Sequence, residues 1–365
     1  MSAKKIINIL RNNNIDCLPN ERFTLNVEMF PDTVEESIFP NQVLFEHPKL
    51  KESKKALNDD GRSLFRFFLD GAQRSYRVME ASIRNHYLPI CAGQIGVAVL
   101  ERMSDGTVSP VTDLTCIRNI LVIPDLLSDA EVKEIEGKIN KELLTEYHFT
   151  VVCYSLKEDK DPGDLGRAKI IHEMQLLELE TIHEMIKQNL ITDRRMLAKD
   201  GGLQYSESKK RQLNLSNTDI VQLRNVIGVA KSFKPTLSLG KGRKRQDLGN
   251  LTKGLGWKER TTVICPDKGK KQHGWWYLRI RPCEQMKSPL QGIVKIEIFA
   301  TGDEVEDGIA TTRADTISSY VLAERNVTPY KADPRWATHL YPIYLTETYL
   351  RSLFLSHTRF KAMII

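Results

Sequence analysis

The sequence lacks an apolar stretch that could cross a bilayer. Its longest segment without Asp, Glu, Lys or Arg surrounds residues 95–100, includes Asn85, Pro89 and Gln94, and is shorter than the ~20 apolar residues that a spanning helix needs. The apolar run at the N-terminus is broken by Asn8 and Arg11, and no small-residue cleavage site follows, so it does not resemble a signal peptide. We therefore expect a cytoplasmic protein without a membrane partner.

Closely spaced cysteines and a large charge excess are also missing. The six cysteines form no Cys-x-x-Cys pair and no Cys/His set at zinc-ligand spacing, which indicates reduced thiols rather than a zinc site. The 53 Lys+Arg and 47 Asp+Glu residues nearly cancel to a net charge of +6, which excludes a purely electrostatic binder. With 41% hydrophobic residues, the chain is typical of a globular protein.

The order of sequence patterns predicts an α/β domain with additions. Residues 1–60 carry scattered prolines and read as an N-terminal arm or a small partner-binding element, with one possible helix at 33–39. Residues 61–365 form the main domain, with an insertion at about 106–165 and a basic hairpin or loop region at about 240–281. We expect strands and helices in the following order: strands 64–69, 74–79 and 94–103, helix 128–144, strand 149–155, helix 167–189, strand 195–199, helix 218–225, strand 226–230, strand 293–301 and helix 343–356.

One carboxylate in the helix predicted at 167–189 lies where an apolar residue belongs. At 100° per residue, Glu178 falls in the middle of the stripe that includes Ile171, Met174, Ile182 and Met185. An ionised carboxylate on a core-facing stripe costs several kcal/mol unless a cation or hydrogen bonds compensate it. A structural ion pair with an arginine would be one compensation, and a bound metal ion would be another.

Two further acids follow predicted strands. Asp70 ends the strand at 64–69 and opens a predicted tight turn, while Asp200 ends the strand at 195–199, on which the helix with Glu178 would pack. Three carboxylates converging on one sheet edge repel each other and raise each other's pKa unless a divalent cation neutralises them. Mg²⁺ and Mn²⁺ prefer such oxygen ligands, and two ions clamped by shared carboxylates can hydrolyse a phosphodiester. The pattern predicts a nuclease site with Asp70, Glu178 and Asp200 as metal ligands.

Short motifs carry a resemblance to a known family. These are FFLDGAQRSYRV around Asp70, the helix with Glu178, MLAKDGGL at 196–203, VIGVAKS at 226–232 and YPIYLTETYL at 341–350. In this order, over about residues 60–360, they resemble the NurA nucleases. The resemblance implies a ribonuclease H-like fold, in which a three-strand antiparallel meander and parallel strands form a mixed sheet flanked by helices. It also implies a homodimeric deoxyribonuclease that uses two Mn²⁺ or Mg²⁺ ions and acts on DNA with a HerA-type hexameric ATPase.

The resemblance leaves part of the site open. The family has a histidine near the segment matched by YPIYLTETYL, and spacing places Tyr349 there instead. Glu347, on the apolar face of the helix predicted at 343–356, and His339, just before it, are the candidates for this fourth group, Glu347 as a further metal ligand. Lys231 matches a basic position of the family and is a candidate for contact with the scissile phosphate. Glu101 is an alternative acid, with an ordinary strand-end ion pair as its other interpretation.

A basic segment predicts nucleic-acid binding without sequence preference. Residues 240–281 contain twelve Lys/Arg and three acids, interleaved with Trp257, Trp275, Trp276 and Tyr277. Basic side chains hold a phosphate backbone and exposed aromatic faces stack on unpaired bases, although burial is the alternative for Trp275 and Trp276. The candidate DNA contacts are Arg74, Lys241, Arg243, Lys244, Arg245, Lys253, Lys258, Lys270 and Lys271.

These observations favour a metal-dependent DNA nuclease that processes ends, in break resection or in anti-phage defence. The alternative is a weakly active or inactive nucleic-acid-binding scaffold, since the family histidine has no counterpart at its expected position.

Overall fold

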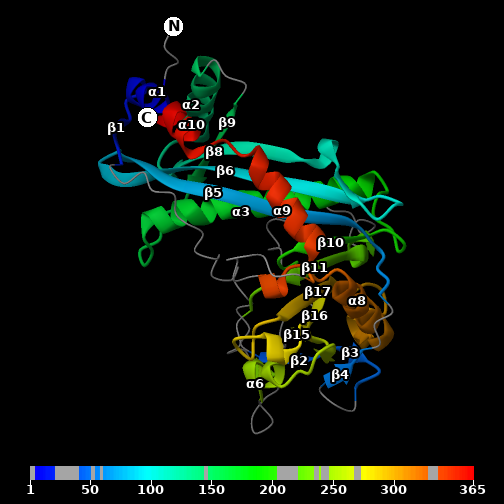
Figure 1. Cartoon of the computed structure of the whole chain (residues 1–365). Coiled ribbons are helices and arrows are strands. Elements are labelled where there is room, and N and C mark those ends of the chain that lie inside the picture. Colours follow the sequence, from blue (N-terminus) through cyan, green and yellow to red (C-terminus); the bar gives the residue numbers. More distant parts are fainter. Residues whose placement is uncertain are drawn as a thin grey trace.

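The chain is a mixed α/β protein built on one large sheet. The computed structural model describes residues 5–20, 41–50, 54–57, 61–143, 147–203, 221–233, 238–239, 246–266, 273–327 and 336–365. Within these ranges, parallel and antiparallel strands form a continuous mixed sheet with helices packed against it (Figure 1). None of the described helices is long and apolar enough to cross a membrane.

The sheet follows a spatial order different from the chain order. Its main path is β13-β12-β2-β15-β16-β17-β11-β10-β5-β6-β8-β9. In chain order these strands are β2 (Asn41–Leu44), β5 (Phe65–Ile83), β6 (His86–Arg102), β8 (Cys116–Pro124), β9 (Phe149–Tyr154), β10 (Met196–Asp200), β11 (Val226–Ala230), β12 (Ser238–Leu239), β13 (Gln246–Asp247), β15 (Ile264–Pro266), β16 (His273–Arg279) and β17 (Ile293–Phe299). Four shorter strands also pair into this sheet: β1 (Asp16–Pro19), β4 (Lys54–Ala56), β7 (Val108–Pro110) and β14 (Glu259–Thr261). β3 (Glu46–His47) and β18 (Ile309–Ala310) form a separate parallel pair.

The described α-helices cover the sheet and its ends. They are α1 (Ile6–Asn12), α2 (Asp129–Glu142), α3 (Pro162–Lys187), α6 (Leu248–Lys253), α7 (Glu304–Asp307), α8 (Thr311–Ala323), α9 (Tyr341–Leu353) and α10 (His357–Ile364). Ser128 caps α2 in a capping box with Glu131, which satisfies backbone donors at that helix start. The helices expected at 128–144, 167–189 and 343–356 are therefore present, with shifted ends.

One long strand replaces the hairpin expected at 64–79. β5 runs without interruption through Asp70 and Gly71, and the turn lies after it, where Arg84 and Asn85 both have positive φ angles. The prediction of a turn at 70–73 is wrong, because Asp-Gly is a turn signal in solvent, whereas Asp70 is buried here with only 4% of its surface exposed. Asp70 therefore lies inside a central strand rather than at a strand end.

Five strands around β5 form the centre of the sheet. β6 pairs antiparallel with both β5 and β8, so these three strands make the meander. On the other side, β10 pairs parallel with β5 and β11 pairs parallel with β10. The third meander strand is β8, since the segments expected as the first two strands both belong to β5 and the expected third strand lies in β6.

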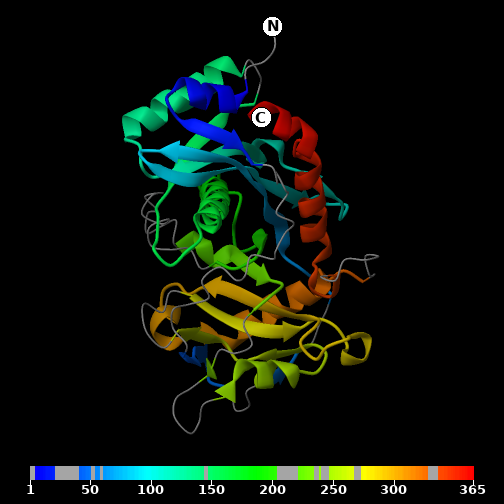
Figure 2. The ribbon, with the colours of Figure 1, turned by 90° about the vertical axis from the view of Figure 1, so that its left-hand side faces the viewer.

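Two helices cover opposite faces of β5. Phe67 and Leu69 pack with Leu177 of α3, whereas Ala72 packs with Leu350 of α9. Successive side chains of a strand point to opposite faces, so these contacts place α3 behind one face and α9 on the other (Figures 1 and 2). Asp70 shares the face of Ala72 and therefore lies on the α9 side.

The described parts of residues 1–60 add short strands to two separate parts of the large sheet. β1 pairs with the C-terminal part of β5, and α1 packs in one apolar cluster with α2 and α10. β2 and β4 pair with β15 and β14 in another part of the sheet. The helix expected at 33–39 and the first three residues of the helix expected at 218–225 fall outside the described residues, whereas residues 221–225 are helical and end in a 3-10 turn at Leu223–Asn225.

Candidate metal and phosphate site

Asp70 and Asp200 lie side by side at the centre of the sheet. The parallel register pairs Lys199 of β10 with Leu69 of β5, and the next position along both strands is Asp200 beside Asp70. Asp200 ends β10, as expected from the sequence. The side chain of Asp200 is 21% exposed, and Asp70 is nearly buried. The two carboxylates thus lie next to each other on the same face of the sheet, although Asp70 comes from the interior of its strand and Asp200 from the end of its strand.

The two carboxylates have opposite electrostatic environments. Burial and the neighbouring charge of Asp200 raise the pKa of Asp70 well above its usual value, with Glu347 and Glu178 adding to the effect and Lys231 opposing it. Burial also disfavours ionisation of Asp200, but Lys231, Lys199 and His339 outweigh it and lower the pKa of Asp200. Without a further cation, Asp200 therefore ionises more readily than Asp70.

The cation among these acids is the ammonium group of Lys231. It follows β11, and its Nζ lies 2.9 Å from Asp200 Oδ2 and 3.8 Å from Glu347 Oε2. Burial lowers the pKa of Lys231, but Asp200, Asp70 and Glu347 together raise it above its usual value. The sequence suggested Lys231 as a phosphate contact, and in the structure its described contacts are with the carboxylates of Asp200 and Glu347.

Helix α9 brings a third carboxylate to the same face. Glu347 lies on the buried side of α9 with Ile343 and Leu350, as the sequence predicted. Its Oε1 accepts a hydrogen bond of 3.0 Å from Arg351 Nε, one turn later on the helix. Glu347 is therefore held between Arg351 and Lys231, at the margin of the Asp70 and Asp200 pair.

His339 also reaches the site, whereas Tyr349 lies elsewhere. His339 is fully buried just before α9, close enough for its charge to lower the pKa of Asp200. Tyr349 packs against the apolar cluster of Ala72, Leu350 and Phe354. Of the candidates for the fourth group, Glu347 and His339 are thus near the paired aspartates.

Glu178 does not join this group of carboxylates. It is buried on α3, and a Cβ atom built on Gly71 would lie 2.4 Å from Glu178 Oε1, so Glu178 occupies the face of the sheet opposite to Asp70. Its Oε2 lies 2.9 Å from Lys199 Nζ. The sequence predicted its burial correctly, but the structure places it behind the strands that carry Asp70 and Asp200.

Glu101 has the ordinary strand-end pairing. It lies near the end of β6, 2.9 Å from Arg66 Nη2, with both side chains about a third exposed. This pair is on the strand ends, away from the group around Lys231.

Part of the basic segment is structural. Arg260 and Arg279 are fully buried and Arg281 is nearly so. Arg279 donates hydrogen bonds to the backbone oxygens of Leu255 and Pro289. Trp275, Trp276 and Tyr277 are fully buried in β16, which lies in the sheet interior with both faces covered, so none of them stacks on bases. Burial, the alternative for the two tryptophans, is confirmed.

A smaller group of the predicted DNA contacts remains accessible among the described residues. Lys253 is exposed at the end of α6, and Lys258 lies over the ring of Trp257, 4.9 Å from its centroid. Trp257 is 46% exposed, so a cation and an aromatic face lie together on the surface. Arg74 instead donates to the backbone oxygen of Leu355, 2.8 Å away. The other candidates, Lys241, Arg243, Lys244, Arg245, Lys270 and Lys271, fall outside the described residues.

The group around Lys231 suits a hard cation in charge and donor type. Asp70, Asp200 and Glu347 supply carboxylate oxygens, and within the described chain Asp200 Oδ1 is buried without a hydrogen-bond partner. As these side chains stand, however, no three His, Cys, Asp or Glu residues of the described ranges are arranged to hold one ion together. The lysine ammonium occupies the position between the acids.

One residue of the site was missed in the sequence. Lys199 is buried on the α3 side of β10, where its Nζ contacts Glu178. The signal was its place in an otherwise apolar strand directly before Asp200, since a buried lysine requires a partner of opposite charge. The sequence suggested an arginine or a metal ion as the partner of Glu178, and the structure supplies Lys199.

Comparisons with known proteins give no assignment. No model of a known protein family matches this chain, and no curated protein matches it.

Proposed function

We propose that this protein is a divalent-metal-dependent deoxyribonuclease of the NurA type. The observation that carries the proposal is the pair of adjacent carboxylates, Asp70 and Asp200, on neighbouring parallel strands. Repulsion and burial raise the pKa of Asp70, so the pair favours an additional cation when both carboxylates are ionised. Such an arrangement costs free energy in the protein alone, and a bound Mn²⁺ or Mg²⁺ would compensate it.

The order of elements supports a ribonuclease H-like interpretation of the central sheet. The chain forms the antiparallel meander β5, β6 and β8, then the long helix α3, and then the strands β10 and β11, which run parallel to β5. This is the succession that the resemblance to NurA nucleases implies. In this interpretation Asp70 comes from the first strand of the meander and Asp200 from the first parallel strand that follows.

Each residue of the site has a role in this proposal. Asp70, Asp200 and Glu347 would hold the ions, which when bound polarise the phosphodiester and activate water. Lys231, between Asp200 and Glu347, is available to contact a phosphate oxygen once metal ions neutralise the acids. Arg351 holds Glu347 in place through its 3.0 Å hydrogen bond.

DNA is the proposed substrate because of the basic surface. Lys253 and the stack of Lys258 on Trp257 offer phosphate and base contacts without a base-reading pattern. By the same resemblance we propose a homodimer that receives DNA from a HerA-type hexameric ATPase, for end processing in repair or defence. The described parts of residues 1–60, which pair with strands in two separate parts of the sheet, are then part of the nuclease body.

A scaffold without catalysis is the second candidate. The observation that favours it is the ammonium of Lys231, which already pairs with Asp200, together with the lack of three ligating groups around one point among the described residues. In this case the chain would bind nucleic acid while a partner performs the chemistry.

Cleavage assays separate these two functions. We expect the metal-free chain to degrade linear double-stranded or single-stranded DNA when Mn²⁺ is added, and to stop when EDTA is added. Inclusion of the ATPase encoded beside this chain, if one exists, tests whether the activity requires the motor. DNA binding without cleavage in every Mn²⁺ and Mg²⁺ condition, with the motor present, would support the scaffold and contradict the nuclease.

A further inference from the structure

The backbone just after Asp200 is held from the back of the sheet by Lys199. Its Nζ donates a 2.7 Å hydrogen bond to the backbone oxygen of Asp200 and a 3.4 Å hydrogen bond to that of Gly202. The same Nζ lies 2.9 Å from Glu178 Oε2, and about 5% or less of either side chain is exposed. A single buried ammonium therefore connects α3 to the turn that follows β10.

A second buried Lys–Glu pair holds the same turn at Leu203. Glu297 Oε2 accepts a 2.7 Å hydrogen bond from the backbone N–H of Leu203, and Glu297 Oε1 lies 2.7 Å from Lys295 Nζ. Lys295 and Glu297 are both on β17, and at most 3% of either side chain is exposed. Burial disfavours ionisation of Glu297, but Lys295 and His273 outweigh it and lower the pKa of Glu297.

The turn itself has a conformation that needs such support. Gly201 has a φ angle of +79°, which residues with a side chain rarely adopt, and its N–H donates a 3.0 Å hydrogen bond to Val229 O on β11. The chain leaves β10 sharply at this residue. The direction of the Asp200 side chain is therefore set by backbone contacts on both sides of Gly201.

Glu178 also lies against Gly71, the residue that follows Asp70 on β5. The contact of its carboxylate with Gly71 leaves no room for a Cβ atom at that position. The Glu178–Lys199 pair thus touches the two strands at the residues adjacent to Asp70 and Asp200. A buried ion pair is weak evidence for stability, because its desolvation cost can exceed its attraction. Its contacts with the backbone of both acid-bearing strands indicate a different use.

We propose that Glu178 is a positioning residue and not a metal ligand. It fixes Lys199, and Lys199 fixes the backbone from Asp200 to Gly202, so that the two aspartates present their carboxylates together on the α9 face. The Lys295–Glu297 pair completes this support at Leu203. The structural half of this inference, the support of the turn after Asp200, rests on the contacts alone. Its functional half, the effect on metal binding, rests on the proposed nuclease function.

The structural half is tested by hydrogen exchange of a peptide covering residues 196–203 in the metal-free chain. We expect Lys199→Met to speed exchange of the amides of Gly201 and Leu203 about tenfold or more, since it removes charge-assisted hydrogen bonds from this turn. The double variant Glu178→Met/Lys199→Met removes both charges and keeps the chain folded if the single variant does not fold. Arg118→Met, which removes the exposed pair with Glu180 of the same helix, is the matched control and should leave this peptide unchanged.

The functional half is tested by Mn²⁺ affinity, measured by calorimetry. Glu178→Gln keeps an acceptor for Lys199 and should bind Mn²⁺ within about threefold of the unaltered chain. The double Met variant should bind about 10- to 100-fold more weakly, as is usual when the partners that orient metal ligands are lost. Asp200→Asn provides the reference for loss of a true ligand.

The outcomes distinguish this inference from the proposed function. If Glu178→Gln weakens Mn²⁺ binding as much as Asp200→Asn does, Glu178 is a ligand and the inference is wrong. If the unaltered chain binds no Mn²⁺, the proposed function fails, and hydrogen exchange alone decides the positioning role. Unchanged exchange at residues 201–203 in both the Lys199→Met and the double Met variants would overturn that role whatever the metal result.

Discussion

Asp70→Asn is expected to abolish Mn²⁺-dependent DNA cleavage and, at the same time, to stabilise the metal-free protein. Loss of a metal-holding carboxylate should lower the cleavage rate at least about a thousandfold, since a bound ion contributes several kcal/mol and each 1.4 kcal/mol is tenfold in rate. The asparagine removes a carboxylate whose ionisation is opposed by burial and by Asp200. Cleavage assays and denaturant unfolding in EDTA measure the two effects.

The stability gain should depend on pH in a defined direction. Because the pKa of Asp70 is raised in the folded chain, folding favours its protonated form. The stabilisation that protonated Asp70 gives the folded chain is fully present below the pKa of about 3.9 that the group has in the unfolded chain. It is lost as the pH rises through the pKa of Asp70 in the folded chain. The difference in unfolding free energy between Asp70→Asn and the unaltered protein should therefore grow from pH 4 towards pH 8.

Asp200→Asn is the matched comparison. The pKa of Asp200 is lowered because Lys231, Lys199 and His339 outweigh its burial. The stabilisation that Asp200 gives the folded chain is therefore present above the pKa that the group has in the unfolded chain, and it is lost as the pH falls through the pKa in the folded chain. This variant should lose cleavage like Asp70→Asn, but it should lose stability at neutral pH because Lys231 loses an ionised partner. Full cleavage by either variant, or destabilisation of the metal-free protein by Asp70→Asn, would contradict the site as described.

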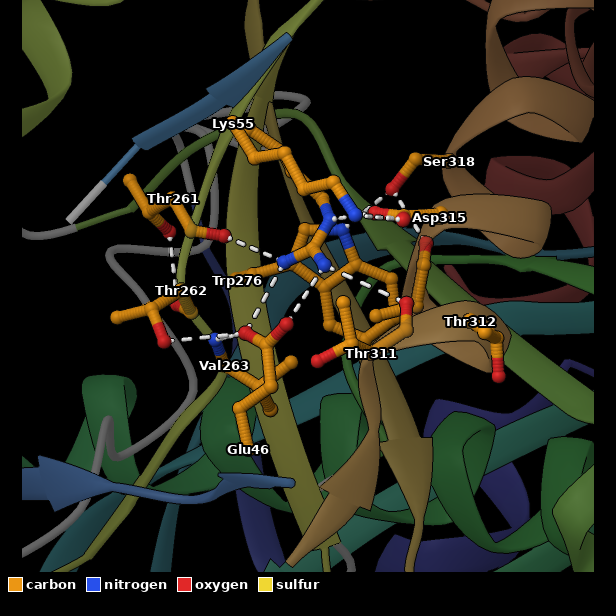
Figure 3. Close-up of polar contacts among 12 residues, drawn as sticks. Glu46, Lys55, Thr261, Thr262, Val263, Trp276, Thr311, Thr312, Asp315 and Ser318 are labelled. Carbon is orange, nitrogen blue, oxygen red and sulfur yellow. Dashed lines mark hydrogen bonds and ion pairs between the residues drawn. The ribbon is translucent and has the colours of Figure 1, made fainter. Parts of the chain in front are cut away.

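Arg260→Met is expected to have the largest effect on stability alone. Arg260 is fully buried, with its Nη2 2.7 Å from Glu46 Oε1 and its Nε 2.7 Å from Asp315 Oδ1. Glu46 also accepts hydrogen bonds from Thr262 and from the backbone of Val263, and Asp315 pairs with Lys55 (Figure 3). Removing the guanidinium leaves the buried negative charge of Glu46 without an opposite charge beside it, which costs about 3–5 kcal/mol.

The same change at an exposed pair gives the control. Arg118 and Glu180 are 42% and 32% exposed, so Arg118→Met should cost no more than about 1 kcal/mol. Urea unfolding of both variants in EDTA measures the difference. If Arg260→Met does not fold, Glu46→Gln keeps an acceptor for Val263 N–H and allows the measurement. Equal stability of the Arg260 and Arg118 variants would show that the buried network does not hold β3, β14 and α8 together.

Local sequence pattern was sufficient for the elements that carry most of the site. The β-branched run at 226–230 became β11, the strand before Asp200 became β10, and Glu347 lies on the buried face of α9 as its spacing predicted. In these segments, periodicity and burial agree with each other. The failure at β5 has a tertiary cause, because contacts with α3 and α9 overrode the local turn signal of Asp70 and Gly71.

The other failures come from partners far apart in the chain. Arg260 was counted with the basic surface, but its partner Glu46 is 214 residues away in the sequence. Glu178 was correctly predicted to be buried, yet which face of the sheet it occupies depends on the packing of α3 against Gly71. Trp276 donates a 2.8 Å hydrogen bond to Ser318 Oγ on α8, so its indole N–H has a buried partner and its ring is not available to stack on a base. No local pattern encodes these pairings.

Calorimetric titration of the metal-free protein with Mn²⁺ tests the central claim, that Asp70 and Asp200 together form a divalent-metal site. The account predicts saturable binding to the folded chain, weakened at least about tenfold by Asp70→Asn and by Asp200→Asn, while Arg118→Met binds normally. No binding to the folded chain, or binding by both aspartate variants that is as strong as in the unaltered chain, would contradict it.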